Sequence, residues 1–313
     1  MLGILLVGFE RFEFLHQNLD LVEKLKGSRF TLYVSIDGPK KSSENYGNSS
    51  QELSGLIKKA SELGSTNFVH NQNMGCDKHI PWAIGKVLQE CESIIVIEDD
   101  VRISCDGLIV MMQKLLEKDD RDYPKVILGM SSLFNPIENL SINIWRSTRF
   151  FTAWGYGLNR EFWKLHTNST LGITTEPELK NLLSKSRYWR KLSTRKKKIW
   201  TERFQRGNYD YRIQATMFQY NLRALAPVFR IVDNIGHGLE GATHTRFREP
   251  IYLRYRVSAK KFRFLTRLLM GNFWNAFFDL LDSNSWAGEG LLTLRGRRIG
   301  IRTFVSRIVK RQK

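Results

Sequence analysis

The sequence lacks the segments that would place it in several common classes of protein. It has three cysteines, an odd number without metal-ligand spacing, so we expect neither a disulfide framework nor a zinc site, and a reducing, cytoplasmic environment. No run of 18 apolar residues occurs, so we expect no membrane-spanning helix. Residues 1–8 are apolar, but Glu10, Arg11 and Glu13 follow at once, so we expect a strand there and not a signal peptide.

Two glycine-rich phosphate-binding loops are also missing. The chain has no Gly-x-x-x-x-Gly-Lys-Ser/Thr motif, and no Gly-x-Gly-x-x-Gly follows its first apolar run. This disfavours P-loop kinases, ATPases and NAD-dependent dehydrogenases. A nucleotide bound here would need its phosphates held by a metal ion and by side chains.

Positive charge is abundant but confined to two segments. The net charge is +18, and residues 187–206 carry nine Lys or Arg against one acid, while residues 246–313 carry sixteen against four. The rest of the chain is close to neutral. A nucleic-acid-binding protein usually carries its basic footprint on the functional fold, so we expect no nucleic-acid partner, although such binding remains an alternative function.

Apolar strands and amphipathic helices alternate along the first hundred residues. The predicted strands are residues 1–8, 30–36, 68–70 and 93–98, and helices are predicted through residue 26 and over 51–63, 79–91 and 107–117. This alternation predicts an α/β fold with an open, twisted, mostly parallel sheet flanked by helices. Further on, short strands are expected at 126–130 and 228–232, and helices at 187–206 and 209–222.

The run Ser93–Ile97 ends in three consecutive carboxylates, Glu98, Asp99 and Asp100. A continuously apolar run is typical of a parallel strand that is buried on both faces. Ligands of open α/β sheets lie outside the carboxyl ends of the strands, where this acidic triplet falls. Adjacent carboxylates repel one another, and Mg²⁺ or Mn²⁺ carrying a phosphate would neutralise them. The alternative is a structural acidic loop.

Charged residues also follow the first two predicted strands. Arg11 comes after the first strand and Asp37 after the second. Because the carboxyl ends of parallel strands meet at one edge of a sheet, we expect Asp37 and the Glu10–Arg11 loop to lie along the same edge as Asp99 and Asp100.

Several segments together resemble one enzyme family. They are Cys76-Asp-Lys-His79-Ile-Pro-Trp82 followed by Ile94–Val101, the segment Trp154-Gly-Tyr156-Gly157, the sequence Tyr209-Asp210-Tyr-Arg212, and Asn234-Ile-Gly236 with Gly241-Ala-Thr-His244-Thr245. They resemble A-type (GT-A) nucleotide-sugar glycosyltransferases. The likeness is strongest to the inverting N-acetylglucosaminyltransferases of N-glycan and O-mannose glycan synthesis and to bacterial sugar transferases of that pattern. It covers about residues 1–246 and is most specific over His79–Asp100.

The resemblance implies a role for each acid of the triplet. Asp100 would bind Mn²⁺ or Mg²⁺ at the diphosphate, and Glu98 and Asp99 would contact the ribose and the sugar. Arg11, Asp37 and His79 would hold the uridine nucleotide. Two alternatives stay open at these positions: Arg11 could pair locally with Glu13, and His79 could be a structural histidine at a helix start.

The remaining implied roles concern the acceptor and the end of the domain. Asp210 would be the base that deprotonates the acceptor hydroxyl, which suits single displacement with inversion, or else an acid of a helix's first turn. Trp154 and Tyr156 would stack on an acceptor sugar or pack in the core. His237 and His244 could bind the metal or shape a loop.

Residues 247–313 lie outside the resemblance and form a predicted basic, aromatic-rich, helical extension. Within it, residues 262–281 interleave arginines with large apolar side chains, which suggests an interfacial helix on the inner face of an anionic membrane, or a helical cap packed on the domain. We therefore expect a metal-dependent inverting enzyme that transfers a hexose or N-acetylhexosamine from a UDP-sugar to a glycan or lipid-linked glycan acceptor. A non-catalytic carbohydrate-binding protein on the same fold is a second alternative.

Overall fold

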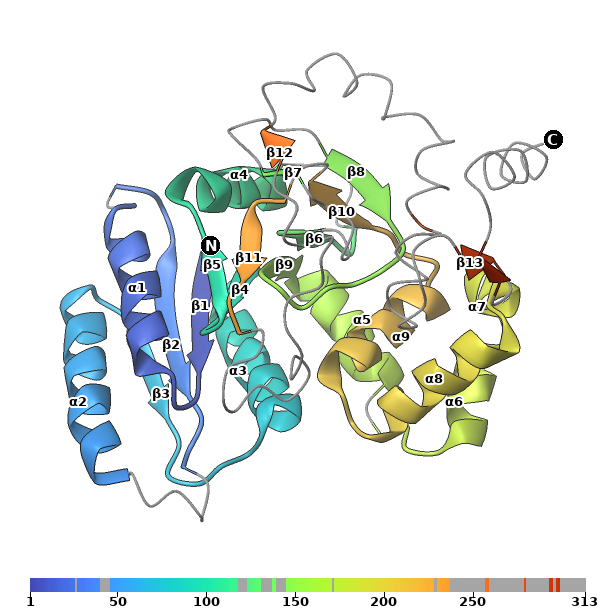
Figure 1. The fold of residues 1–313 in the computed structure, drawn as a ribbon, viewed down its shortest axis with the longest axis horizontal. Helices are drawn as coiled ribbons and strands as arrows, with labels where there is room; N and C mark the ends of the chain where they lie inside the picture. Colours follow the sequence, from blue (N-terminus) through green and yellow to red (C-terminus); the bar gives the residue numbers. More distant parts are fainter. Residues whose placement is uncertain are drawn as a thin grey trace. The chain divides into compact units, whose positions relative to one another are not determined.

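The chain divides into two compact units. In a computed structural model, unit 1 comprises Met1–Gly129, Ala153–Leu165 and Ile231–Arg248, and unit 2 comprises Met130–Thr152, His166–Arg230 and Glu249–Lys313. The residues that the structure describes are 1–25, 27–39, 46–117, 123–130, 137–138, 145–170, 172–227, 230–236, 257–258, 279, 293–294 and 297–298. Figure 1 shows the elements of both units coloured along the sequence.

Unit 1 is built on a mixed, mostly parallel sheet. Its neighbouring strands follow the order β3-β2-β1-β4-β9-β6, in which β9 runs antiparallel to β4 and β6. The strands are β1 (Leu2–Gly8), β2 (Thr31–Ile36), β3 (Thr66–Val69), β4 (Ser93–Glu98), β6 (Val126–Leu128) and β9 (Tyr156–Asn159). The helices are α1 (Phe12–Glu23), α2 (Tyr46–Glu62), α3 (Cys76–Glu90) and α4 (Cys105–Leu116), while α5 (Arg160–Thr170) crosses the unit boundary. The α/β prediction is confirmed.

Strand β1 lies at the centre of the parallel part of the sheet. All of its residues are buried, and it pairs in parallel with β2 and with β4. The continuous burial of β1 and of Ser93–Ile97 explains why neither sequence alternates, since helices cover both faces.

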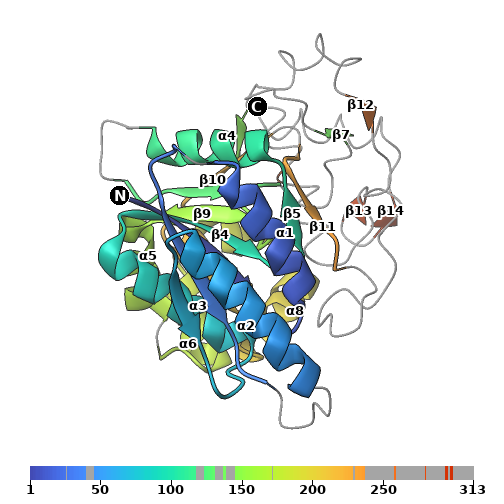
Figure 2. The same cartoon turned by 90° about the vertical axis from the view of Figure 1, so that its left-hand side faces the viewer.

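Helices α1 and α3 pack on opposite faces of β1. A Cβ atom added at Gly8 would meet Leu15 of α1, whereas one added at Gly3 would meet Val87 of α3. Side chains at even and odd positions of a strand point to opposite faces, so the two helices cover both sides. Helices α1 and α2 run side by side, as Figure 2 shows.

A two-stranded antiparallel ribbon follows the acidic triplet. Strand β5 (Val101–Ile103) pairs with β11 (Val232–Asn234), with Val101 opposite Asn234. Strand β5 was not predicted, and β11 begins at Val232, where the strand predicted at 228–232 was expected to end. The ribbon brings the loop after Asn234 next to the end of β4, because β5 begins directly after Asp100.

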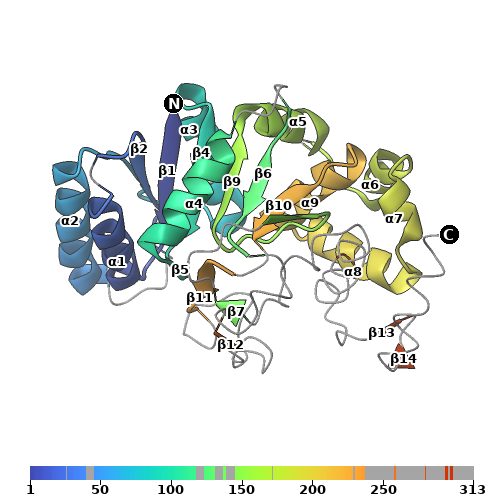
Figure 3. The same ribbon diagram turned by 90° about the horizontal axis from the view of Figure 1, so that it is seen from above.

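Unit 2 is mainly helical and has an aromatic core. Its described elements are β7 (Ile137–Glu138), β8 (Trp145–Thr148), α6 (Glu176–Leu183), α7 (Arg187–Lys191), α8 (Thr194–Gln205), α9 (Tyr209–Gln219), β10 (Ala224–Pro227), β12 (Val257–Ser258), β13 (Thr293–Leu294) and β14 (Arg297–Arg298). Strands β8 and β10 pair antiparallel. Figure 3 shows α6 to α9 gathered together. Buried residues of these helices, including Trp189, Trp200, Phe204 and Phe218, pack around Phe150.

The basic segment forms two helices where one was predicted. Helix α7 ends at Lys191, and α8 begins after Ser193, whose hydroxyl accepts a hydrogen bond from the backbone N–H of Lys196. Leu192 is extended between them. A serine cap at this point starts a new helix instead of continuing the old one.

Most of the predicted C-terminal extension lies outside the described residues, and so does nearly all of the predicted interfacial helix at 262–281. Asp279 is the described member of that segment. Among the described residues, no helix has the length and hydropathy needed to cross a bilayer.

Candidate functional site

The loops after β1 and β4 meet through an ion-pair cluster in unit 1. Arg11 Nη2 lies 2.5 Å from Asp99 Oδ1, and Arg11 Nη1 lies 3.2 Å from Asp100 Oδ2. Strands β1 and β4 are parallel neighbours, so the residues that follow them emerge at the same edge of the sheet. Arg11 thus lies beside the acidic triplet, as predicted, and pairs with Asp99 and Asp100 instead of with Glu13.

The cluster carries more negative than positive charge. Burial raises the pKa of Asp99 to about 6, although the Arg11 guanidinium acts in the opposite direction. Burial alone would lower the pKa of Arg11, but the two carboxylates raise it. One guanidinium faces two carboxylates, and the half-buried Glu98 precedes them. The cluster of Arg11, Asp99 and Asp100 therefore carries a net negative charge among these described side chains, which suits a cation.

Asp99 and Asp100 differ in their access to solvent. Asp99 is 4% exposed, and its second carboxylate oxygen accepts a hydrogen bond from the Phe9 backbone N–H at 3.3 Å. The Asp100 side chain is 16% exposed, and its carboxylate contacts Arg11. Asp99 is thus engaged on both oxygens, whereas Asp100 is the acid that a ligand can reach.

The loop after β11 closes over Asp100 at a glycine. The Ile235 backbone N–H donates to the Asp100 carbonyl oxygen at 2.8 Å. A Cβ atom at Gly236 would lie 2.4 Å from Asp100 Oδ2 and 3.0 Å from Arg11 Nη1. The backbone therefore approaches the cluster more closely than any side chain would allow.

The donor set fits a metal ion that arrives with a phosphate. Within the described part of the chain, no three His, Cys, Asp or Glu side chains are placed to hold a metal together. Asp100 is nevertheless a hard oxygen ligand in an electronegative cluster. Mg²⁺ typically binds through one or two carboxylates while substrate phosphates and water complete its shell, and carboxylates also suit Mn²⁺.

Asp37 follows β2, but its carboxylate binds the chain itself. Oδ1 accepts hydrogen bonds from the backbone N–H groups of Gly38 at 2.9 Å and Met74 at 2.8 Å. Oδ2 accepts from Gly75 N at 2.9 Å and from Asn73 Nδ2 at 3.2 Å. Asp37 is 6% exposed and fixes the loop that leads into α3. Its contact with the uridine nucleotide stays a prediction.

His79 is enclosed beside that loop in the first turn of α3. Its exposed fraction is 2%, and Nε2 lies 2.7 Å from the hydroxyl oxygen of Ser35. The His70 ring packs edge-on against it at 5.3 Å. Burial lowers the pKa of His79 to about 4, although Asp37 acts in the opposite direction, so the ring is neutral at pH 7. The structural histidine is the alternative that this burial favours.

Tyr156 and Trp154, the two aromatic residues predicted to contact the acceptor, differ in their exposure to solvent. Tyr156 is 0% exposed, lies in β9 and pairs with Val96 of β4 and Leu128 of β6, so its burial favours core packing over the predicted acceptor contact. Its ring belongs to the core, because β9 is an interior strand. Trp154 precedes β9, is half-buried, and stays a prediction as an acceptor contact.

Asp210 lies in unit 2, in the first turn of α9. Its Oδ1 accepts a hydrogen bond from the Tyr211 backbone N–H at 2.9 Å. Burial raises the pKa of the Tyr211 hydroxyl, and the nearby charge of Asp210 raises it further. The function of Asp210 as a base stays a prediction. His237 and His244 lie outside the described residues.

Three contributors to the site were missed in the sequence. Asn73 and Ser35 hold Asp37 and His79, and Gly236 forms the wall over Asp100. The Asn73-x-Gly75 turn before α3 and a glycine after β11 were the available signals.

Comparison with known proteins gives structural likeness alone. No family model and no curated protein matches the chain. A solved structure titled a mannosyltransferase, PcManGT from Pyrobaculum calidifontis in complex with GDP-Man and Mn²⁺, is 9% identical with a TM-score of 0.40. That match covers 70% of this chain and 69% of the other. A glycosyltransferase involved in glycosylation of the major capsid of PBCV-1 is 9% identical with a TM-score of 0.25, covering 57% and 74%.

The strand order of unit 1 and the position of its acidic triplet can be compared with the sequence resemblance directly. Parallel strands β3, β2, β1 and β4 place an acidic triplet at the carboxyl edge of the sheet. In topology, unit 1 is GT-A-like. The GT-A resemblance seen in the sequence and the ion-pair cluster thus fall on the same strand ends.

Proposed function

We propose that the protein is a metal-dependent, inverting glycosyltransferase. It transfers a hexose or N-acetylhexosamine from a UDP-sugar to a glycan or lipid-linked glycan acceptor. The observation that carries the proposal is the Arg11–Asp99–Asp100 cluster, an electronegative site at the carboxyl edge of a parallel sheet with one reachable carboxylate. A nucleotide diphosphate with its metal ion matches this charge and this position.

The residues of unit 1 would hold the donor. Asp100 would bind Mn²⁺ or Mg²⁺, and the metal would act as a Lewis acid that stabilises negative charge on the leaving nucleoside diphosphate. Arg11 fixes the orientation of both aspartates and adds a positive charge at the same edge. Glu98 would contact the ribose or the sugar, while the buried Asp99 would support the site through its bonds to Arg11 and to the Phe9 backbone N–H.

The backbone at Gly236 and the loop before α3 would complete the donor site. Gly236 leaves room for a ligand where a side chain would press on Asp100. Asp37 holds the loop before α3, so it would shape the nucleotide-binding surface without a direct contact. His79 would support this loop as a buried, neutral side chain.

The acceptor chemistry would belong to Asp210. An attacking hydroxyl is a weak nucleophile, and a positioned carboxylate that accepts its proton typically contributes about 10²–10⁴ in rate. Asp210 would accept that proton as the hydroxyl oxygen attacks the anomeric carbon, and the bond to the diphosphate oxygen would break. One displacement of this kind inverts the anomeric configuration.

A thermal-shift and hydrolysis screen over UDP-, GDP- and dTDP-sugars, with and without Mn²⁺, tests the proposal. The expected result is a Mn²⁺-dependent rise in Tm with UDP and slow release of UDP from one UDP-sugar. Sugar binding without nucleotide binding would instead support the carbohydrate-binding alternative. Salt-dependent binding of DNA with no nucleotide response would support the nucleic-acid alternative.

A further inference from the structure

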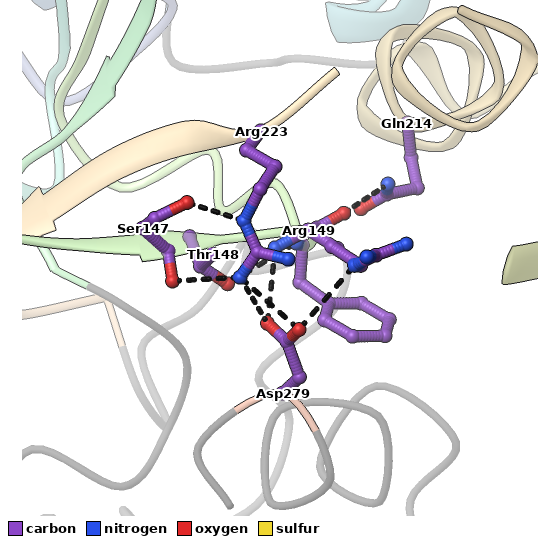
Figure 4. Close-up of polar contacts among 7 residues, drawn as sticks. Ser147, Thr148, Arg149, Gln214, Arg223 and Asp279 are labelled. Carbon is purple, nitrogen blue, oxygen red and sulfur yellow. Dashed lines mark hydrogen bonds and ion pairs between the residues drawn. The ribbon is translucent and has the colours of Figure 1, made fainter. Parts of the chain in front are cut away.

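A residue of the C-terminal region is bound into unit 2 by two arginines. Arg223 Nη2 lies 3.3 Å from Asp279 Oδ1 and 3.2 Å from Oδ2. Arg149 Nε lies 3.5 Å from Asp279 Oδ2, and the Arg149 backbone N–H donates to Oδ1 at 3.2 Å. Figure 4 shows these groups converging on one carboxylate. Asp279 is 8% exposed, so the interaction is largely shielded from water.

Arg223 is itself held in place by β8. Its Nη2 donates to the Ser147 carbonyl oxygen at 3.0 Å, and its Nε bonds to the Ser147 hydroxyl. The arginine thus joins the end of β8 to Asp279 and has little freedom to turn away.

The other side of Arg149 is bound to helix α9. Gln214 Nε2 donates to the Arg149 carbonyl oxygen at 2.8 Å, and Gln214 Oε1 accepts from the Phe151 backbone N–H at 2.6 Å. Gln214 is 0% exposed. The segment 149–151 therefore lies between two side chains (Figure 4). Asp279 accepts from the Arg149 backbone N–H, and Gln214 bonds to the Arg149 carbonyl and the Phe151 backbone N–H.

Gln214 is four residues after Asp210 in α9. Residues spaced by four lie on the same face of a helix, about one turn apart, so the bonds to segment 149–151 act on the face that bears Asp210. The other face is fixed separately: Arg212 Nη1 donates to the carbonyls of Thr170 and Ile173, and Thr216 bonds to His166.

The charges make this connection depend on Asp279. Two guanidiniums share one carboxylate in a mostly buried place. Burial lowers the pKa of Arg149, and the charge of Arg223 lowers it further. Without Asp279 the two cations would repel one another and lose the carboxylate that they share, and Arg149 would lose the partner of its backbone N–H.

We propose that Asp279 is a positioning residue for Asp210, because it holds segment 149–151 against Gln214 and so sets the orientation of α9. The inference rests on the proposed function of Asp210. It gives Asp279, a residue of the C-terminal region, a function in activating the acceptor.

Two variants and a control test this. Asp279→Asn keeps the size of the side chain and removes its charge; Asp279→Glu keeps the charge. Glu202→Gln, in α8, removes an exposed acid of unit 2 whose ion pair with Lys198 spans 4.0 Å at the surface. We expect Asp279→Asn to increase amide hydrogen exchange in residues 209–214, whereas Asp279→Glu keeps the protection at least partly and Glu202→Gln leaves it unchanged. Exchange in Asp279→Asn equal to the wild type would overturn the proposal.

Turnover gives the second readout. Release of nucleoside diphosphate is measured per nucleotide-binding site, so that unfolded protein is not counted. Displacement of a catalytic group by about 1 Å can cost up to 10²-fold, so Asp279→Asn should lower kcat by about 10-fold or more with the donor KM unchanged. Asp279→Glu should recover most of it. A wild-type kcat in Asp279→Asn, or an equal loss in Glu202→Gln, would overturn the proposal.

The two ideas fail in different ways. If the wild-type protein binds no nucleotide and turns over no nucleotide sugar, the proposed function is wrong, and the hydrogen-exchange experiment still decides whether Asp279 braces α9. If the wild type is active and Asp279→Asn matches it, the bracing is wrong and the proposed function stands.

Discussion

The Arg11 guanidinium lies 2.5 Å from the Asp99 carboxylate, across the ends of two neighbouring parallel strands. The pair joins the loop after β1 to the acidic triplet after β4. It fixes the orientation of Asp99 and leaves Asp100 as the more exposed acid. This difference is the reason for proposing Asp99 as the supporting carboxylate and Asp100 as the metal ligand.

Replacement of Arg11 by glutamine should destabilise unit 1 in a pH-dependent way. Asp99 would stay buried without its counter-charge, which costs about 2–4 kcal/mol at pH 8. The cost should shrink at pH 5, because the pKa of Asp99, already about 6, rises further and the neutral acid needs no partner. Urea unfolding at the two pH values measures this. Arg102→Gln is the control, since Arg102 is exposed and bonds to Gln17; a loss in Arg11→Gln no larger than in this control would contradict the argument.

Gly236→Ala tests the close approach over Asp100. The added Cβ would lie 2.4 Å from Asp100 Oδ2, so the loop or the carboxylate has to move. We expect Mn²⁺-dependent UDP affinity to fall by about 10-fold or more, with small loss of stability, as isothermal titration calorimetry and thermal unfolding would show. Gly55→Ala in α2 is the matched control: nothing lies within 4 Å of the added atom, and stability should rise by up to about 1 kcal/mol. Unchanged UDP affinity in Gly236→Ala would show that this wall does not shape the site.

Asp37→Asn separates bracing from nucleotide contact. An amide presents N–H groups to backbone donors that now bond to a carboxylate, so we expect a loss of about 1–3 kcal/mol in the absence of any nucleotide. A variant with full stability and weaker UDP binding would instead indicate a direct contact with the ligand. Thermal unfolding and UDP titration of the same sample distinguish the two.

The strand-end geometry followed from simple rules. Continuous apolar runs at 1–8 and 93–98 predicted two buried parallel strands, and parallel strands bring Arg11 and Asp99 to one edge. This part could be predicted because it depends on local hydrophobicity and on the handedness of the crossovers.

What the sequence could not supply depends on contacts between distant residues. Tyr156 sits in a glycine-containing segment that carries no strand signal, yet the segment forms the interior strand β9 because β4 and β6 flank it. The Asp37 carboxylate accepts hydrogen bonds from Asn73, Met74 and Gly75, which no local pattern in the sequence predicted. The pairing of Asp279 with Arg149 and Arg223 joins segments that share no local pattern.

His166 predicts how unit 2 responds to acid. Its side chain is 7% exposed and bonds to Thr216, and burial lowers its pKa to about 3 with a further contribution from Arg212. The unfolded chain binds a proton near the ordinary pKa of 6.5, so between about pH 6.5 and 3 it binds more protons than the folded chain. Stability should therefore fall as the pH falls through this window. His166→Gln should remove about one proton from the uptake on unfolding; an unchanged slope of unfolding free energy against pH would contradict this.

The central claim is that one half of the site holds the metal and diphosphate while another residue activates the acceptor. The most direct measurement compares Mn²⁺-dependent UDP binding and sugar transfer in Asp100→Ala and Asp210→Asn. We predict that Asp100→Ala loses both, whereas Asp210→Asn binds UDP as the wild type does and loses transfer. Full turnover by Asp210→Asn, or wild-type Mn²⁺-dependent UDP binding by Asp100→Ala, would contradict the account.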